Sequence, residues 1–321
     1  MGVVSSLSTA VQTLKRNPVL FVAGFVVAFV NATVAGGQML STGPARIAWS
    51  LGTFVVQLGS LVFVVGAYGM TAEALGGTTR LRTLVSAGKK YFADALAATV
   101  LVVIAVVATS VVTMVVGLVG FFAVVLGGSG TGFSPNLLAV VMGAIYLLGL
   151  LPLFFLQFYL PAVVVSDCSP AESLKQSYRL VKGNFVSTLG FDAVLVAVAA
   201  VGSLPTILLA VRQMSPLSPG SAGMGGAGMG GAGMGGAGMG GAGMGAGGPM
   251  MYPFAGLSPG TVGIVFALTA VVGTLTGTFF YAYQVAFYEE SLLDGAGGEN
   301  TNGTGGDGMD ADDVTPVGTD L

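Results

Sequence analysis

The sequence predicts an all-α, polytopic membrane helical bundle, in which six transmembrane helices form three tandem hairpin units, each preceded by a short interfacial amphipathic helix. Three observations predict this fold: charge is scarce, six long stretches are apolar, and basic residues alternate regularly between those stretches. Of the 321 residues, 54% are hydrophobic and only 8% are charged, whereas a soluble domain carries about 25% charged residues. So little charge cannot cover a water-exposed surface.

Six stretches are long and apolar enough to cross a bilayer. A helix needs roughly 20 mostly apolar residues to span a hydrocarbon layer about 30 Å thick, and its backbone must hydrogen-bond internally because no water is present there. The six predicted spans cover residues 18–39, 49–72, 93–126, 137–165, 186–211 and 261–288. No cleavable signal peptide is expected, because the first apolar stretch is already a full-length span.

The third predicted span is too long for a perpendicular crossing. Its roughly 34 residues predict a helix that tilts strongly, protrudes from the bilayer or breaks near Gly117 and Gly120. A re-entrant hairpin of two shorter helices is the other alternative. In the fourth and fifth spans, Pro152, Pro161 and Pro205 predict kinks.

Basic residues alternate between the two sides of these spans. Cytoplasmic loops close to a membrane are enriched in Lys and Arg. The odd-numbered segments outside the spans hold nine basic residues: Lys15, Arg16, Arg80, Arg82, Lys89, Lys90, Lys175, Arg179 and Lys182. The even-numbered segments hold only Arg46 and Arg212. This asymmetry predicts a multi-pass protein of the cell membrane with both termini in the cytoplasm.

Three amphipathic lead-in stretches carry most of these basic residues, each directly ahead of an odd-numbered span. They end in Lys15-Arg16-Asn17-Pro18, Gly88-Lys89-Lys90-Tyr91-Phe92 and Lys182-Gly183-Asn184-Phe185. Their apolar residues recur every three or four positions, so one face can lie at the headgroup boundary while basic side chains bind anionic lipid headgroups. The residues predicted to contact headgroups are Lys15, Arg16, Lys89, Lys90, Lys175, Arg179 and Lys182.

The order of lead-in, span, outer loop and span occurs three times. It divides the membrane domain, residues 1–290, into parallel units 1–74, 75–167 and 168–290. In the third unit, SPAESLKQSYRLVKGNFVSTLGF (residues 169–191) follows the apolar run Leu160-Pro161-Ala162-Val163-Val164. The start of the longer motif is typical of a helix N-terminus, with Ser169 as the N-cap, Pro170 at the first helical position and Glu172 at the third.

These two motifs resemble a family of multi-pass proteins that look like the membrane domain attached to some glycerophosphodiester phosphodiesterases, of a haloarchaeal type. The resemblance implies a membrane fold with an anchoring or scaffold role. It implies no phosphodiesterase reaction, because the metal-binding His residues of such an enzyme have no counterpart in a chain without His.

Residues 212–258 are predicted to form a disordered, Gly- and Met-rich outer loop, because so much glycine is costly to order. A five-residue period places Met224, Met229, Met234, Met239 and Met244 in register. Thioether sulfurs suit Cu(I), which makes these five methionines weak candidates for metal ligands. A neutral repeat expansion is the preferred interpretation.

Residues 291–321 are predicted to be a disordered, acidic, cytoplasmic tail. From Glu289 to Leu321 there are nine acidic residues and no basic one. An acidic segment facing water, next to a basic collar facing lipid, is typical of proteins from salt-loving archaea, since solvated carboxylates resist salting-out. The tail is interpreted as solubilising, with partner docking as the alternative.

Asp192 is the one acidic residue predicted to lie well inside the hydrocarbon layer. It follows Asn184 by eight residues, about 12 Å along a helix. A charge at such depth is costly and is therefore a functional candidate. It has either a proton- or cation-linked role or a structural one, hydrogen-bonded to another helix. Interhelical hydrogen bonds are also predicted for the uncharged residues Asn31, Gln57, Gln157 and Gln284.

No catalytic residue, cofactor or nucleic-acid partner is predicted. With no His and one Cys, the chain has neither a Ser-His-Asp triad, nor a His-ligated zinc, nor a CxxC site. The leading hypothesis is a non-enzymatic membrane scaffold or anchor that contacts anionic lipids and an unknown protein partner. The alternative is a small-solute or lipid transporter that uses Asp192 and the kinked fourth and fifth helices.

Overall fold

The computed structural model describes residues 2–40, 44–127, 135–214 and 259–298, which form nine α-helices and no strand. The helices are α1 (Gly2–Arg16), α2 (Leu20–Leu40), α3 (Pro44–Gly76), α4 (Leu81–Gly127), α5 (Pro135–Leu156), α6 (Tyr159–Val165), α7 (Pro170–Gly183), α8 (Phe185–Met214) and α9 (Pro259–Gly298). The predicted all-α class is confirmed for this part of the chain.

Several helices are long and apolar enough to cross a membrane. Among the described residues, five candidate spans cover Ile47–Gly76, Leu81–Gly120, Leu147–Val165, Phe185–Leu204 and Phe266–Leu293. A sixth is reached if α1 and the first part of α2, which are bent by 97° relative to each other, count as one span. Long apolar helices of this kind indicate a protein embedded in a membrane.

Two of the three lead-in segments end at an asparagine that interrupts the helix. The backbone N–H of Asn17 donates to the carbonyl of Thr13 at 2.9 Å, and its side-chain amide reaches the same oxygen at 3.4 Å. Asn184 repeats this geometry with Leu180, at 2.9 and 3.3 Å. A side-chain amide that competes for the helix backbone favours a break at this point.

The second unit has Tyr91 at the corresponding position, two residues after a lysine as in the other two units. Tyr91 has no amide to compete with the backbone, and α4 continues without interruption from the lead-in stretch into the span. The prediction of a separate amphipathic helix in each unit is therefore wrong for the second unit. In the first and third units a separate amphipathic helix is present, as α1 and α7.

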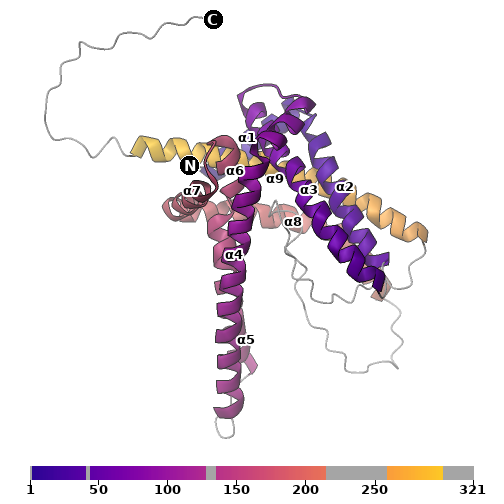
Figure 1. Cartoon of the computed structure of the whole chain (residues 1–321), viewed down its shortest axis with the longest axis vertical. Coiled ribbons are helices and arrows are strands. Elements are labelled where there is room, and N and C mark those ends of the chain that lie inside the picture. The colour runs from indigo at the N-terminus through magenta and orange to yellow at the C-terminus, as the bar shows by residue number, and fades with distance from the viewer. Residues whose placement is uncertain (1, 41–43, 128–134, 215–258, 299–321) are drawn as a thin grey trace, which may run out of the picture.

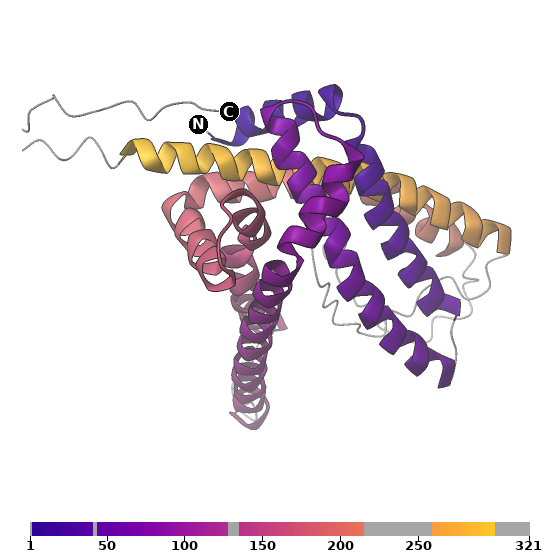
Figure 2. The same ribbon diagram turned by 45° about the horizontal axis from the view of Figure 1, so that its top comes forward.

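The long third span is a single helix. The 47 residues of α4 run through Gly117 and Gly120 without a break and extend for about 70 Å. Neither the predicted break at these glycines nor the re-entrant hairpin is present in the described residues, whereas tilt and protrusion from the bilayer stay predictions. With α5, α4 forms a hairpin that projects away from the remaining helices (Figures 1 and 2).

Helices pack across the boundaries of the predicted units. The most extensive contact joins α3 to α4, which belong to different units. Helix α9 crosses the molecule mainly beside α1 and α2, with which it shares more extensive contacts than with α8 (Figure 1). The α2–α3 and α4–α5 pairs match the predicted hairpins, whereas the third unit does not form a comparable one.

Close helix contacts are made at glycines. A Cβ added to Gly66 on α3 would meet the carbonyl oxygen of Leu84 on α4, and one added to Gly88 would meet that of Val62. The two backbones can approach this closely only because neither glycine carries a side chain. This contact brings the lead-in part of α4 against α3.

Both low-complexity segments lie almost entirely outside the described residues. Helix α8 ends at Met214 and α9 begins at Pro259, and most of the segment predicted as the Gly- and Met-rich loop lies between them, outside the described residues. At the other end, α9 continues to Gly298, beyond residue 291, where the predicted tail begins.

Candidate functional site

The segments predicted to face the cytoplasm are bonded directly to one another. Asn17, between α1 and α2, is 3% exposed, and its amide donates to the carbonyl of Gly77 at 3.0 Å and more weakly to that of Ala74 at 3.4 Å. Its oxygen accepts the backbone N–H of Thr79 at 3.2 Å. Asn17 thus holds the α1–α2 corner against the connection between α3 and α4.

Two further contacts extend this arrangement. Lys90 on α4 forms an ion pair with Asp167, between α6 and α7, at 3.3 Å. Ser5 and Ser6 in the first turns of α1 donate to the two carboxylate oxygens of Glu290 on α9. Since α1 has no acidic residue in its own first turn, the carboxylate of Glu290 also complements the positive end of that helix dipole.

The residues predicted to bind lipid headgroups lie on these joined segments, and all seven are exposed. We call these seven residues the basic platform; its members are Lys15, Arg16, Lys89, Lys90, Lys175, Arg179 and Lys182. Lys90, Lys175 and Arg179 expose 58%, 67% and 69% of their side chains. Lys15, Arg16 and Lys182 lie in the last turns of α1 and α7, where cations are favoured by the helix dipole.

The opposite faces of α1 and α7 are buried against the protein. On α1 the buried residues are Gly2, Ser6, Ala10, Thr13 and Leu14, and on α7 they are Ser173, Ser177, Leu180 and Val181. Much of each buried face is small or hydroxylated. The spacing of apolar residues therefore predicted the two amphipathic helices. It did not predict that small and hydroxylated residues make up much of the face that packs on the protein.

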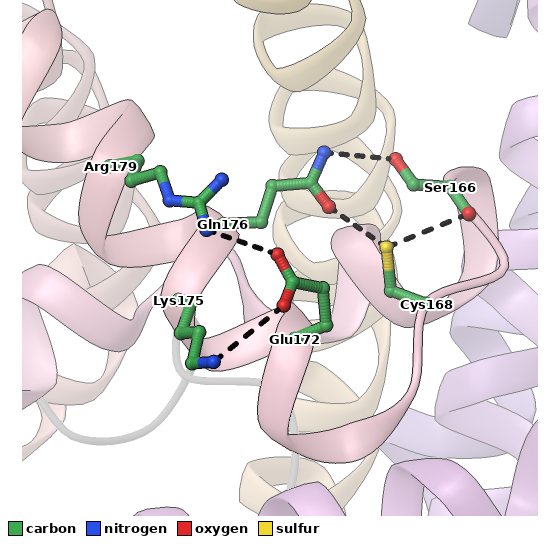
Figure 3. A network of polar contacts seen from close by, with 6 residues as sticks. All are labelled: Ser166, Cys168, Glu172, Lys175, Gln176 and Arg179. Atoms are coloured by element: carbon green, nitrogen blue, oxygen red, sulfur yellow. Dashed lines mark hydrogen bonds and ion pairs between the residues drawn. The ribbon is translucent and has the colours of Figure 1, made fainter.

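Helix α7 holds both ends of the short helix α6. Ser177 accepts the N–H of Phe158 at 3.1 Å and donates to the carbonyl of Phe155 at 2.9 Å, which satisfies the backbone where α5 gives way to α6. At the other end, the amide of Gln176 donates to the hydroxyl of Ser166 at 3.3 Å (Figure 3). The two motifs that carry the family resemblance thus form α6 and α7 and pack together.

The α6–α7 corner contains a further polar network (Figure 3). The thiol of Cys168 donates to the side-chain oxygen of Gln176 at 3.0 Å. On the outer side of α7, the carboxylate of Glu172 pairs with Arg179 at 3.2 Å and, at the limit of an ion pair, with Lys175 at 4.0 Å. Asp167 has a φ of 51°, which aspartate tolerates better than most side chains.

Burial raises the pKa of the Cys168 thiol above its ordinary value, and the charges of Glu172 and Asp167 raise it further. Both effects disfavour the thiolate. The corner therefore keeps the single cysteine as a neutral hydrogen-bond donor.

A chain of polar contacts crosses the interior and ends at Asp192. The hydroxyl of Tyr68 on α3 donates to the side-chain oxygen of Gln284 on α9, and both residues are buried. The amide of Gln284 donates to the backbone carbonyl of Gln157 at 2.6 Å. The amide of Gln157 lies 3.4 Å from the carboxylate of Asp192 on α8.

Pro161 explains why the carbonyl of Gln157 is available to Gln284. In an uninterrupted helix this carbonyl would accept the N–H of the residue four positions later, which is Pro161 and has none. Gln284 supplies the missing donor from α9. The predicted kink in the fourth span is thus a break at residues 157–158, filled by a side chain from another helix.

Aromatic rings pack directly beside this polar chain. Phe158, Phe191, Tyr283 and Phe287 are fully buried, and neighbouring rings in this group lie 4.6–5.4 Å apart between centroids. Three of these rings adjoin polar residues in the sequence, as Gln157-Phe158, Phe191-Asp192 and Tyr283-Gln284. The polar chain therefore lies against a closely packed aromatic core.

Of the interior polar residues predicted to bond between helices, Gln157 and Gln284 do so at this chain, and Gln57 donates to Asn31 at 3.4 Å. Sequence reasoning missed Tyr68, Ser177 and Glu290. Tyr68 and Ser177 are residue types common in any helix, and their partners are distant in sequence. The methionine candidates Met224, Met229, Met234, Met239 and Met244 lie outside the described residues.

The long apolar helices, with a basic platform at one end of several of them, define the class of multi-pass helical membrane proteins. The chain belongs to the family described as domain of unknown function DUF7847, whose family model matches residues 1–291. No curated protein and no solved structure matches the chain.

Proposed function

We propose that the protein is a non-enzymatic scaffold of the membrane surface, in which the basic platform binds anionic lipid headgroups and holds a protein partner beside them. One observation carries the proposal: seven exposed basic side chains lie on three separate segments that are bonded to one another by Asn17, by the Lys90–Asp167 pair and through α7. Each Lys or Arg near an anionic leaflet contributes about 1 kcal/mol to binding.

The proposal includes an orientation. The platform faces the cytoplasm, six spans cross the cell membrane, and both termini are cytoplasmic, as the nine-to-two distribution of basic residues indicates. The acidic tail supports a halophilic archaeal origin. The resemblance of α6 and α7 to a membrane domain attached to phosphodiesterases supports an anchoring role.

A charge-removal experiment on α7 tests the scaffold. In the full chain, the triple change Lys175→Gln, Arg179→Gln and Lys182→Gln should weaken phosphatidylglycerol binding at least tenfold, measured by lipid titration with native mass spectrometry. The matched control is Glu172→Gln on the same helix, which removes an acid that pairs with Arg179 and should not weaken binding. Equal affinity of the triple variant and the unaltered chain would contradict the lipid part.

The proposed binding of a protein partner is tested by cross-linking in cells. A protein cross-linked to the unaltered chain should be lost from the triple variant and kept by Glu172→Gln. A partner profile that is identical in all three chains would contradict the scaffold, because the platform would then not hold the partner.

The interior polar chain favours a second candidate, a small-solute or lipid transporter whose transport is linked to protonation of Asp192. Asp192 contacts Gln157 at the point where α5 gives way to α6. No basic side chain of the described residues forms an ion pair with Asp192. When the carboxyl group of Asp192 gains or loses a proton, its contact with Gln157 can change. Because Gln157 lies at the break between α5 and α6, the geometry of that break can change as well.

Asp192→Asn separates the two candidates. It keeps an oxygen acceptor for Gln157 but removes the titratable charge. If the protein transports, proton flux into vesicles containing the full chain should fall at unchanged protein level, whereas Asp94→Asn, an exposed acid on α4, should leave flux unchanged. Flux that is equal in the Asp192→Asn variant and the unaltered chain would exclude the transporter.

A further inference from the structure

A cavity of about 380 Å³ lies between α3, α4 and α6, beside the basic platform. Its volume is in the range of small-molecule sites, roughly 300–1,000 Å³. Glu73, Thr83, Ser86, Lys90 and Tyr91 supply its polar lining, and Val164 with small residues of α3 and α4 supplies the apolar part. The lining therefore offers one cation, one anion and three hydroxyl groups.

The cationic group of the cavity is held in place. The ammonium of Lys90 donates to the hydroxyl of Tyr91 at 2.7 Å, lies 4.3 Å from the centre of that ring, and pairs with Asp167 at 3.3 Å. An ammonium has three N–H donors, so one donor remains for a ligand after these two polar contacts. Lysine in such a position binds phosphate as a point charge.

The anionic group is held as well. The carboxylate of Glu73 accepts the hydroxyl of Thr79 at 2.7 Å, and a carboxylate has room for several further donors. A ligand that satisfies both Lys90 and Glu73 must therefore carry an anionic acceptor together with hydrogen-bond donors, which can be hydroxyl or ammonium groups. A bare phosphate offers Glu73 only repulsion.

The surrounding charge favours a single negative charge on the ligand. Four basic residues at the start of α4 and just before it outnumber the three nearby carboxylates of Glu73, Asp94 and Asp167; they are Arg80, Arg82, Lys89 and Lys90. The exposed apolar residues Leu81 and Val85 on the same stretch of α4 suit a membrane interface. Both features point to a lipid and not to a free metabolite.

We propose that this cavity is a specific site for the headgroup of a phosphoglycerol lipid, with the phosphate on Lys90 and the glycerol hydroxyls on Glu73. The site rests on the proposed function, which it deepens by naming the lipid class. The remaining platform residues attract anionic lipid without selecting a headgroup, whereas the cavity selects one.

Headgroup preference is the quantity to measure, by native mass spectrometry of the full chain titrated with phosphatidylglycerol, phosphatidic acid or phosphatidylethanolamine. The unaltered chain should bind phosphatidylglycerol at least fivefold more tightly than the other two. Lys90→Gln should abolish this preference, whereas the control Lys89→Gln, an exposed neighbour outside the cavity lining, should weaken binding of both anionic lipids and retain the preference for phosphatidylglycerol over phosphatidic acid. Glu73→Gln should lower the ratio of phosphatidylglycerol to phosphatidic acid affinity, because it removes the repulsion of phosphatidic acid and leaves a neutral amide oxygen as a weaker hydroxyl acceptor.

Two further experiments test whether the headgroup preference comes from the cavity and whether its ligand is a lipid. Ser86→Phe places a ring in the cavity from an exposed position and replaces neither residue of the Lys90–Asp167 pair, and it should abolish the preference at an unchanged thermal unfolding midpoint. Soluble glycerol 3-phosphate should not displace the lipid at millimolar concentration; displacement would assign the site to a free phosphorylated polyol and overturn the lipid proposal.

Preference for phosphatidylethanolamine, or equal effects of Lys89→Gln and Lys90→Gln, would also overturn the site. The α7 triple variant leaves every cavity residue intact, so it separates the two proposals. If it binds lipid normally while Lys90→Gln loses headgroup preference, the scaffold proposal fails and the cavity stands. If instead the α7 triple variant loses lipid binding while Lys90→Gln keeps its headgroup preference, the cavity proposal fails and the scaffold proposal stands.

Discussion

Asn17 shows how a single side chain can join distant segments of this protein. It bonds the backbone at Gly77 and Thr79 from a buried position. Asn17→Ala leaves the N–H of the buried Thr79 unpaired, and a buried unpaired group costs about 1–3 kcal/mol, whereas the carbonyl of the exposed Gly77 can bond to water. We therefore expect a clearly lower thermal unfolding midpoint for the full chain in detergent.

Two other asparagines serve as controls for this prediction. Asn31→Ala, at an exposed position, removes only the 3.4 Å bond from Gln57 and should lower the free energy of unfolding by about 0.6 kcal/mol. Asn184→Ala should have an intermediate effect, because the side chain of Asn184 bonds only to its own helix, at Leu180. Equal midpoints for all three variants would contradict the role assigned to Asn17.

The reactivity of Cys168 is also a matter of one residue and its neighbours. Because its thiol pKa is raised by burial and by Glu172 and Asp167, less thiolate is present at any given pH than in the unfolded chain. Alkylation by iodoacetamide should therefore be slow at pH 7.5, and its pH profile should rise at a higher pH than that of the denatured protein. Glu172→Gln should shift the profile toward lower pH, and coincident profiles for folded and denatured protein would refute this account.

At the scale of elements, the α3–α4 contact depends on glycine. In Gly66→Ala the new Cβ meets the backbone oxygen of Leu84, which cannot move without separating the helices. Overpacking of this kind costs about 1–3 kcal/mol. We expect a reduced thermal unfolding midpoint, whereas Gly59→Ala on the same helix, where a Cβ meets nothing within 4 Å, should be neutral or slightly stabilising. Similar midpoints for the two variants would show that the close approach is not required.

The positions of the helices could be predicted from the sequence because hydrophobic length and helix breakers are local signals. The breaks at Asn17 and Asn184 belong to motifs visible in the sequence. The continuity of α4 was missed, because the second lead-in stretch was grouped with the others by its lysines, although Tyr91 lacks the amide that ends the helix in the other two. Residue type at one position, and not charge pattern, decided this difference.

At the scale of the whole molecule, the contacts between distant segments could not be predicted in the same way. Pro161 and Gln284 are each visible in the sequence, but only the crossing of α9 over the α5–α6 break brings them together. Likewise, Asp192 was identified as an interior acid, while its link to Tyr68 needs four helices to meet. Such pairings depend on tertiary packing, which a single sequence does not encode in any local pattern.

The proposed orientation applies to the whole chain and can be tested with single cysteines in intact cells. In a Cys168→Ser background, Ala237→Cys in the Gly- and Met-rich segment should react with a membrane-impermeant maleimide added outside. Thr304→Cys near the carboxyl end should react only after the cells are opened. The physical reason is that translocating the nine basic residues of the odd-numbered segments is unfavourable, and only two basic residues lie on the other side. The opposite labelling pattern would place the basic platform outside the cell, away from the anionic cytoplasmic leaflet on which the scaffold proposal depends.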